Sequence, residues 1–273
     1  MQIKCLLPIL LLLACPLWAS DLAREGRIAA EIRDGLVVGE PVMLQADGND
    51  FFTLYTQEQS TYSHGAVILL HGRGAHPDWA DVIHPLRVGL PGYGWKTLSI
   101  QLPIAAADAS GWVYTELIPE AFPRITAAVE YLKQQDVTNI VLVGHSLGAR
   151  MGVEYLAQTV PEEVKAYVAI GLSARKEGPG DSTLAALGKL QLPLLDIYGS
   201  QDLDAVLQSG PERARAARLA ENPGYRQRQI AGADHFFTGL DDTLLAEVRA
   251  WLGRIAADVQ VQQNNLDVNV NTN

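Results

Sequence analysis

The chain has 273 residues, of which 48% are hydrophobic and 19% are charged, and a chain of this size and composition can bury the core of one large α/β domain. Its formal net charge of −10 argues against partners recognised through their phosphates, so we expect no nucleic-acid binding. No run of about 18 apolar residues follows the N-terminal segment, so we expect no membrane span in the body of the chain.

The first residues have the layout of a secretory signal peptide. Lys4 precedes an apolar stretch that runs to Ala14, and small residues follow at Ala19 and Ser20. This order predicts a signal peptide over 1–19, cleavage after Ala19 and export to the periplasm or the medium. The apolar stretch is short for an uncleaved anchor.

Lipidation is the alternative interpretation of this segment. The letters LLLAC, which end at Cys15, resemble the lipobox of bacterial lipoproteins and would leave a lipid-anchored Cys15 as the new N-terminus. The apolar Pro16-Leu17-Trp18 that follows is unusual after such a cysteine. Because Cys5 and Cys15 both lie in this segment, the exported domain is expected to carry no thiol, disulfide or cysteine-based metal site.

The remaining chain begins with a predicted hairpin and then alternates strands with helices. Residues 41–46 and 51–57, joined by DGND, are typical of an antiparallel hairpin. Further strands are expected at 65–72, 95–103, 139–144, 165–172, 192–200 and 225–230, and helices at 120–135, 147–160, 211–222 and 241–259. This order predicts one α/β domain over 20–257 with a mostly parallel sheet and helices on both faces. The polar, Asn/Gln-rich residues 258–273 are expected to be disordered.

The most informative motif lies where the strand at 139–144 meets the following helix. Gly144-His145-Ser146-Leu147-Gly148 fits G-x-S-x-G in the strand-then-helix context that this motif requires. A serine there sits in a strained backbone on a very tight turn, so small residues are needed two positions to either side. We therefore predict that Ser146 is a nucleophile; the alternative is a glycine-rich turn with an inert serine.

A serine hydroxyl needs a base, and the base needs an orienting acid, in the chain order Ser, acid, His for this motif. His235 is the sole histidine downstream of Ser146 and is therefore the predicted base. The letters GSQDLD after the strand at 192–200 offer Asp202 and Asp204. Asp202 is the preferred acid because it lies in the turn itself, whereas Asp204 has a competing interpretation as a helix cap.

The oxyanion hole is expected after the strand at 65–72. Gly72-Arg73-Gly74 allows the backbone to turn its N–H groups toward the nucleophile. The predicted donors are the N–H of Arg73, with Gly74 as the less favoured choice, and the N–H of Leu147. The Arg73 side chain is interpreted as a solvated loop residue, with contact to an anionic substrate as the alternative.

Aromatic residues and two irregular segments are candidates for the substrate pocket. Trp79, Trp112 and Tyr114 are equally compatible with an acyl pocket and with the core. The segments 105–117 and 173–189 are expected to leave the carboxyl ends of strands, where ligands bind in such sheets, and a lid function stays open for both. The sequence contains neither H-E-x-x-H nor a G-x-x-x-x-G-K-[ST] loop, so we predict no metal and no nucleotide cofactor.

With these pieces assembled, the chain resembles the α/β-hydrolase superfamily from about residue 41 to about residue 257. The resemblance rests on LLHGRG, GHSLGA, YGSQD and GADHFF, which occur in the order of the superfamily. HGRGAHPDW and TLSIQLP are most similar to a poorly characterised branch of exported bacterial members. The resemblance implies the fold, serine-esterase chemistry, the triad Ser146, Asp202 and His235, and structural roles for His71 and His145.

We therefore predict a serine hydrolase that cleaves a carboxylic ester or thioester of a small molecule through an acyl-enzyme on Ser146. Two alternatives remain open at this stage. One is a non-catalytic envelope or scaffold protein on the same fold, because a fold does not determine function. The other is an acyltransferase, which differs only in the acceptor that reaches the acyl-enzyme.

Overall fold

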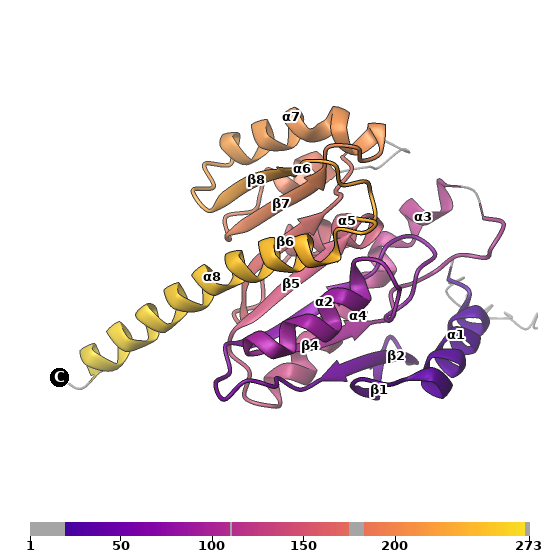
Figure 1. The fold of residues 1–273 in the computed structure, drawn as a ribbon, viewed down its shortest axis with the longest axis horizontal. Coiled ribbons are helices and arrows are strands. Elements are labelled where there is room, and N and C mark those ends of the chain that lie inside the picture. Colours follow the sequence, from indigo (N-terminus) through magenta and orange to yellow (C-terminus); the bar gives the residue numbers. More distant parts are fainter. Residues whose placement is uncertain (1–19, 110, 175–182, 271–273) are drawn as a thin grey trace, which may run out of the picture.

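The computed structural model describes residues 20–109, 111–174 and 183–270, and of residues 256–270 it describes the backbone only (Figure 1). The predicted signal peptide and Cys15 lie outside the described residues, as does part of the candidate lid segment at 173–189.

One eight-stranded sheet, in the order β1-β2-β4-β3-β5-β6-β7-β8, forms the centre of the described chain. Its antiparallel pairs are β1 with β2 and β2 with β4, and all other neighbours are parallel. The predicted hairpin and mostly parallel sheet are therefore confirmed. The strands are β1 (Glu40–Ala46), β2 (Asn49–Thr56), β3 (Gly65–Leu70), β4 (Trp95–Ile100), β5 (Ile140–His145), β6 (Val164–Ile170), β7 (Leu194–Gly199) and β8 (Tyr225–Ile230).

Helices cover both faces of this sheet (Figure 1). One apolar cluster packs α4 and α5 against one face, and a second packs α2 and α8 against the other. The central strands are buried from both sides, which explains why the run Val67–Leu70 of β3 is apolar throughout. The helices are α1 (Leu22–Gly35), α2 (Ile83–Gly89), the 3₁₀ helix η1 (Leu90–Tyr93), α3 (Val113–Glu116), α4 (Ile118–Lys133), α5 (Leu147–Leu156), α6 (Thr183–Leu187), α7 (Asp204–Leu219) and α8 (Asp241–Val270).

Helix α1 has no counterpart among the predicted elements. Its buried face contributes Ala29 to a small apolar cluster with Phe52 and Leu54 of β2. Glu25 forms an ion pair with Arg124 of α4, with 2.8 Å between Oε2 and Nη1, and both side chains are buried. Burial raises the pKa of the Glu25 carboxyl, although Arg124 opposes this rise. Helix α1 is thus tied to the body through this buried charge pair, apolar contacts and hydrogen bonds to Ile104 and Ala105.

Two helices extend well beyond their predicted ranges. Helix α7 begins at Asp204 instead of 211, so Pro211 lies inside the helix. A proline there removes one backbone hydrogen bond of the helix. Close to it, Arg213 donates from Nη1 to the Val206 carbonyl oxygen at 2.8 Å. The sequence predicts disorder for 258–273, whereas α8 continues as a helix to Val270, since extending an existing helix avoids the cost of nucleation.

A buried cluster around Asp196 joins β7, β8 and α7. The fully buried carboxylate of Asp196 in β7 accepts hydrogen bonds from Arg213 at 2.8 and 3.2 Å, from Tyr225 at 2.7 Å and from Gln227 at 2.9 Å. Burial and the adjacent negative charge raise the pKa of Tyr225 well above its usual value, so it acts as a donor. This cluster fixes the last two strands relative to the helix that connects them.

The parallel strands place six segments at one edge of the sheet. The chain leaves β3 toward β4 on one side and reaches β5 on the other, and ligands bind at such a reversal, beyond the carboxyl ends of the strands. The segments that follow β3, β4, β5, β6, β7 and β8 all emerge at this edge because these strands are parallel. They carry the predicted site residues.

Candidate active site

Ser146 lies at the join of β5 and α5 in a left-handed backbone conformation, with φ 55° and ψ −117°. Such a conformation strains a residue with a side chain and persists only where its surroundings enforce it. A Cβ on Gly144 would lie 2.7 Å from the Ala149 Cα, and one on Gly148 would clash with the Leu70 and His71 carbonyl oxygens. Both glycines are therefore needed for α5 to start this close to the sheet, as the sequence predicts.

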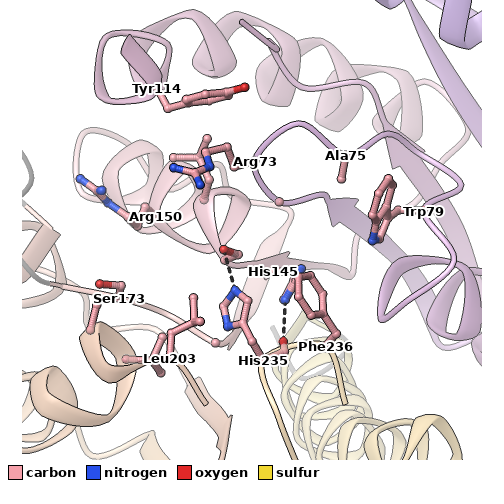
Figure 2. A pocket seen from close by; sticks show the side chains of 16 residues that line it. Arg73, Ala75, Trp79, Tyr114, His145, Arg150, Ser173, Leu203, His235 and Phe236 are labelled. Carbon is pink, nitrogen blue, oxygen red and sulfur yellow. Dashed lines mark hydrogen bonds between the residues drawn. The ribbon is translucent and has the colours of Figure 1, made fainter. Parts of the chain in front are cut away.

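The structure brings Ser146, His235 and Asp202 into one hydrogen-bonded chain. His235 Nδ1 lies 2.6 Å from Asp202 Oδ1, and His235 Nε2 lies 2.9 Å from Ser146 Oγ (Figure 2 draws the second bond). A carboxylate only accepts, so Nδ1–H donates to Asp202 and leaves Nε2 to accept the Ser146 hydroxyl proton. His235 and Asp202 are each only 6% exposed.

Of the acidic residues weighed from the sequence, Asp202 is the one that reaches the histidine. Its carboxylate also accepts the Leu203 N–H at 2.7 Å and the Gly199 N–H at 3.3 Å, which hold it in place. Asp204 is the first residue of α7 and makes no side-chain cap bond, so its predicted capping role is wrong in detail. There its charge still complements the helix dipole.

The His235 loop is held from three directions. His145 donates from Nε2 to the His235 carbonyl oxygen at 3.0 Å (Figure 2), and burial, with the nearby His235, lowers the pKa of His145 to about 4. Asp234 accepts the N–H groups of Phe236 and Thr238 at 3.0 and 2.9 Å, bonds that lower its pKa. Gly171, which has φ 59°, lies against the imidazole ring, so that a Cβ there would approach His235 Cε1 to 2.9 Å. The sequence analysis did not identify Gly171 as a site residue, although it directly follows the apolar strand β6.

The predicted oxyanion donors, the N–H groups of Arg73 and Leu147, belong to residues that line the same cavity as Ser146. Within the described parts of the chain, neither N–H donates to another protein group. His71 orients the loop that carries Arg73. Its Nδ1 donates to the Gly72 carbonyl oxygen at 2.9 Å, and its Nε2 accepts the Leu102 N–H at 2.9 Å. Burial lowers the pKa of His71 to about 3, so the ring is neutral.

A cavity of about 330 Å³ opens onto Ser146. Tyr114 lines it, as does Trp79, whereas Trp112 does not, and the Trp112 side chain is 57% exposed. The prediction of Trp112 as a pocket residue is thus wrong, because α3 starts beyond it and carries only Tyr114 inward. Ser173, the first residue of the candidate segment 173–189, also lines the cavity, and the lining residues that sequence analysis missed include Arg150, Leu203 and Phe236 (Figure 2). The sequence indicated Phe236 and Arg150 only through their positions, since Phe236 follows His235 directly and Arg150 lies one helical turn after Ser146.

Across residues 20–109, 111–174 and 183–270, no group of three or more His, Cys, Asp or Glu side chains is arranged to hold a metal ion. Over the same ranges, no helix is both long and apolar enough to span a membrane.

Comparison with known proteins shows the family of this chain. The model of the family described as "Protein of unknown function (DUF3530)" matches residues 20–112 and 113–254. The chain belongs to this family. No curated protein matches the sequence.

Solved structures show the fold of this DUF3530 member. Est1E from Butyrivibrio proteoclasticus superposes with a TM-score of 0.63 at 15% identity, over 80% of this chain and 99% of that one. The Pyrococcus furiosus esterase Pf2001 gives a TM-score of 0.65 at 16% identity, over 82% and 92%. An alpha-beta serine hydrolase homologue from Coxiella burnetii gives 0.58 at 18% identity, over 80% and 98%. The predicted α/β-hydrolase fold is confirmed.

Gly171 provides a test of how closely His235 is positioned. We expect Gly171→Ala to displace the imidazole and to slow the reaction of Ser146 with a fluorophosphonate roughly 100-fold, since a misplacement of about 1 Å can cost that much. Gly239→Ala is the matched control, because Gly239 also has a positive φ of 69° but its Cβ would meet nothing within 4 Å. Labelling rates and thermal midpoints of both variants should be measured. Equal labelling rates in the two variants would show that Gly171 does not position the base.

Proposed function

We propose that this chain is a serine hydrolase that cleaves a carboxylic ester or thioester through an acyl-enzyme on Ser146. The observation that carries the proposal is the chain of hydrogen bonds from Ser146 through His235 to Asp202, at 2.9 and 2.6 Å, starting from a strained turn at the mouth of a cavity. A strained nucleophile joined to a base and a buried acid is the arrangement that serine-based acyl transfer requires.

In the first half of the proposed reaction, Ser146 Oγ attacks the carbonyl carbon while its proton passes to His235 Nε2. The carbonyl π electrons move onto oxygen, and the N–H groups of Arg73 and Leu147 stabilise the resulting oxyanion. Asp202 stabilises the imidazolium that forms. When the tetrahedral intermediate collapses, the bond to the alcohol or thiol breaks and His235 returns the proton to the leaving group.

In the second half, water replaces the departed alcohol. His235 accepts a proton from the water as its oxygen attacks the acyl carbon, and the oxyanion forms again at the same N–H groups. Collapse then breaks the bond to Ser146 Oγ, which recovers its proton from His235 and releases the carboxylic acid. An acyltransferase would use the same steps with another acceptor in place of water.

The descriptions of two structural neighbours support this proposal, and the first is Pf2001, which is named as an esterase. The Coxiella burnetii protein is described as a serine hydrolase homologue. The geometry at Ser146 in this chain carries the argument independently of those names.

A fluorophosphonate probe tests the nucleophile. We expect the purified protein to be labelled with one probe per chain and Ser146→Ala to lose all labelling, because only a serine activated by a base reacts. Ser173→Ala is the matched control, since Ser173 lines the same cavity and is not bonded to His235; this variant should still be labelled. A Ser146→Ala protein that retains its fold by circular dichroism and is labelled like the original would overturn the proposal.

We propose further that the protein acts outside the cytoplasm after removal of residues 1–19. The charge, apolar and small-residue order of this segment supports the proposal. Helix α1 starts at Leu22, and the Asp21 N–H before it donates to the Ile104 carbonyl oxygen at 2.7 Å. Cleavage after Ala19 would therefore leave the docked helix intact.

The intact mass of the protein isolated from its native host decides between the processing schemes. We expect a mass that starts at Ser20. A mass that retains residues 1–19 would contradict cleavage, and a mass that corresponds to a lipid-modified Cys15 would establish the lipoprotein alternative.

A further inference from the structure

The cavity beside Ser146 is lined by two arginines, Arg73 and Arg150. In the described parts of the chain no aspartate or glutamate lines it. This composition runs against that of the whole protein, which has 31 acidic and 21 basic residues. The charged side chains of the described residues that line the cavity are therefore both arginines.

Arg73 lines the cavity beside the ring of Tyr114. Its guanidinium carbon lies 5.4 Å from the centre of the Tyr114 ring (Figure 2), a cation–π contact that restrains the planar head group. Within the described residues, the Arg73 side chain forms no ion pair or hydrogen bond with the protein. Its donors therefore remain available to an external acceptor, and a guanidinium suits a carboxylate or a similar oxyanion because it donates in a planar fork.

Arg150 is the second and more deeply placed arginine of the cavity. It lies on α5 one turn after Ser146, is only 3% exposed, and donates from Nε to Thr183 Oγ1 at 3.2 Å. Thr183 in turn donates to Glu154 at 3.0 Å, and Glu154 does not line the cavity. In Figure 2 the head group of Arg73 extends toward the side of the site on which Arg150 lies.

The other side of the nucleophile has a different character. Ala75, Trp79 and Phe236 line the cavity there, on the opposite side of His235 from Arg73 and Arg150 in Figure 2. These residues offer apolar and aromatic surface and no charge. A substrate that crosses Ser146 therefore meets cationic donors at one end and apolar surface at the other.

From this arrangement we infer that the substrate is an ester or thioester with a negatively charged group, such as a carboxylate, on one side of the scissile bond and an apolar group on the other. Arg73 binds the anion. This inference rests on the proposed hydrolase function and specifies the class of substrate for the same site.

Two matched pairs of esters test the inference. The first pair is mono-p-nitrophenyl adipate and its methyl ester, which differ by a charge on the acyl side. The second pair is the butyrate esters of 4-hydroxybenzoic acid and of methyl 4-hydroxybenzoate, which differ by a charge on the alcohol side. We expect kcat/KM to favour the anionic member of one pair by roughly tenfold or more, because hydrogen bonds to charged groups contribute on this scale.

The ratio of anionic to neutral kcat/KM is then compared between variants. Arg73→Gln should reduce the ratio to near one and Arg73→Lys should retain part of it, while salt should weaken it because the Arg73 side chain is exposed. Arg249→Gln is the matched control: Arg249 also stacks on a tyrosine, 4.6 Å from the Tyr93 ring centre, but does not line the cavity. It should leave the ratio unchanged.

The outcomes separate this inference from the proposed function. Hydrolysis of both neutral esters with no preference in either pair, or a preference that survives in Arg73→Gln, would overturn the anionic substrate and leave the hydrolase intact. Failure to hydrolyse any of the four esters, together with absence of fluorophosphonate labelling, would overturn both.

Discussion

The site depends on one steric constraint, the close approach of α5 to strands β3 and β5. Gly148 lies against the carbonyl oxygens at the end of β3, and Gly144 lies against the first turn of α5 and the Tyr167 hydroxyl. Only residues without a Cβ permit this contact. The turn between them must then hold Ser146 with a φ of 55°, which raises its side chain above the edge of the sheet. The strain at Ser146 destabilises the fold locally. The packing of α5 against the sheet offsets this strain energy, so the conformation of one residue depends on the surrounding core.

The remaining parts of the site follow from the parallel arrangement of β3, β4, β5, β6, β7 and β8. Each strand delivers one loop to the same edge, and rigid elements rather than flexible segments set the spacing between them. The Asp196 cluster has a particular place in this scheme because it joins β7, which precedes Asp202, to β8, which precedes His235. Removing one partner of such a buried charge pair typically costs about 3–5 kcal/mol. The distance between acid and base is thus determined partly by ionic contacts away from the reacting atoms.

The sequence predicts those features that depend on local sterics and chain order. G-x-S-x-G requires a strand before it and a helix after it, and His235 is the sole downstream histidine, so the fold and the grouping of Ser146, Asp202 and His235 follow from short motifs. Features set by distant contacts were not predictable in this way. Helix α1 is held by Glu25 pairing with Arg124, 99 positions away, and Gly171 is required because of a ring that arrives from β8. Trp112 and Tyr114 are near neighbours in sequence, yet only the start of α3 decides which of them turns inward.

The central claim is that His235, oriented by Asp202, activates Ser146, and the comparison of Asp202→Asn with Asp204→Asn tests it most directly. Asp202→Asn keeps the shape of the side chain but favours the wrong tautomer of the histidine, a change that lowers kcat about 10⁴-fold in serine proteases. Asp204 lies two residues further on, in the first turn of α7, and its carboxylate makes no cap bond. We predict that kcat for an ester that wild type hydrolyses falls by several orders of magnitude in Asp202→Asn and stays within a few-fold of wild type in Asp204→Asn. Equal losses in the two variants, or a larger loss in Asp204→Asn, would contradict the account.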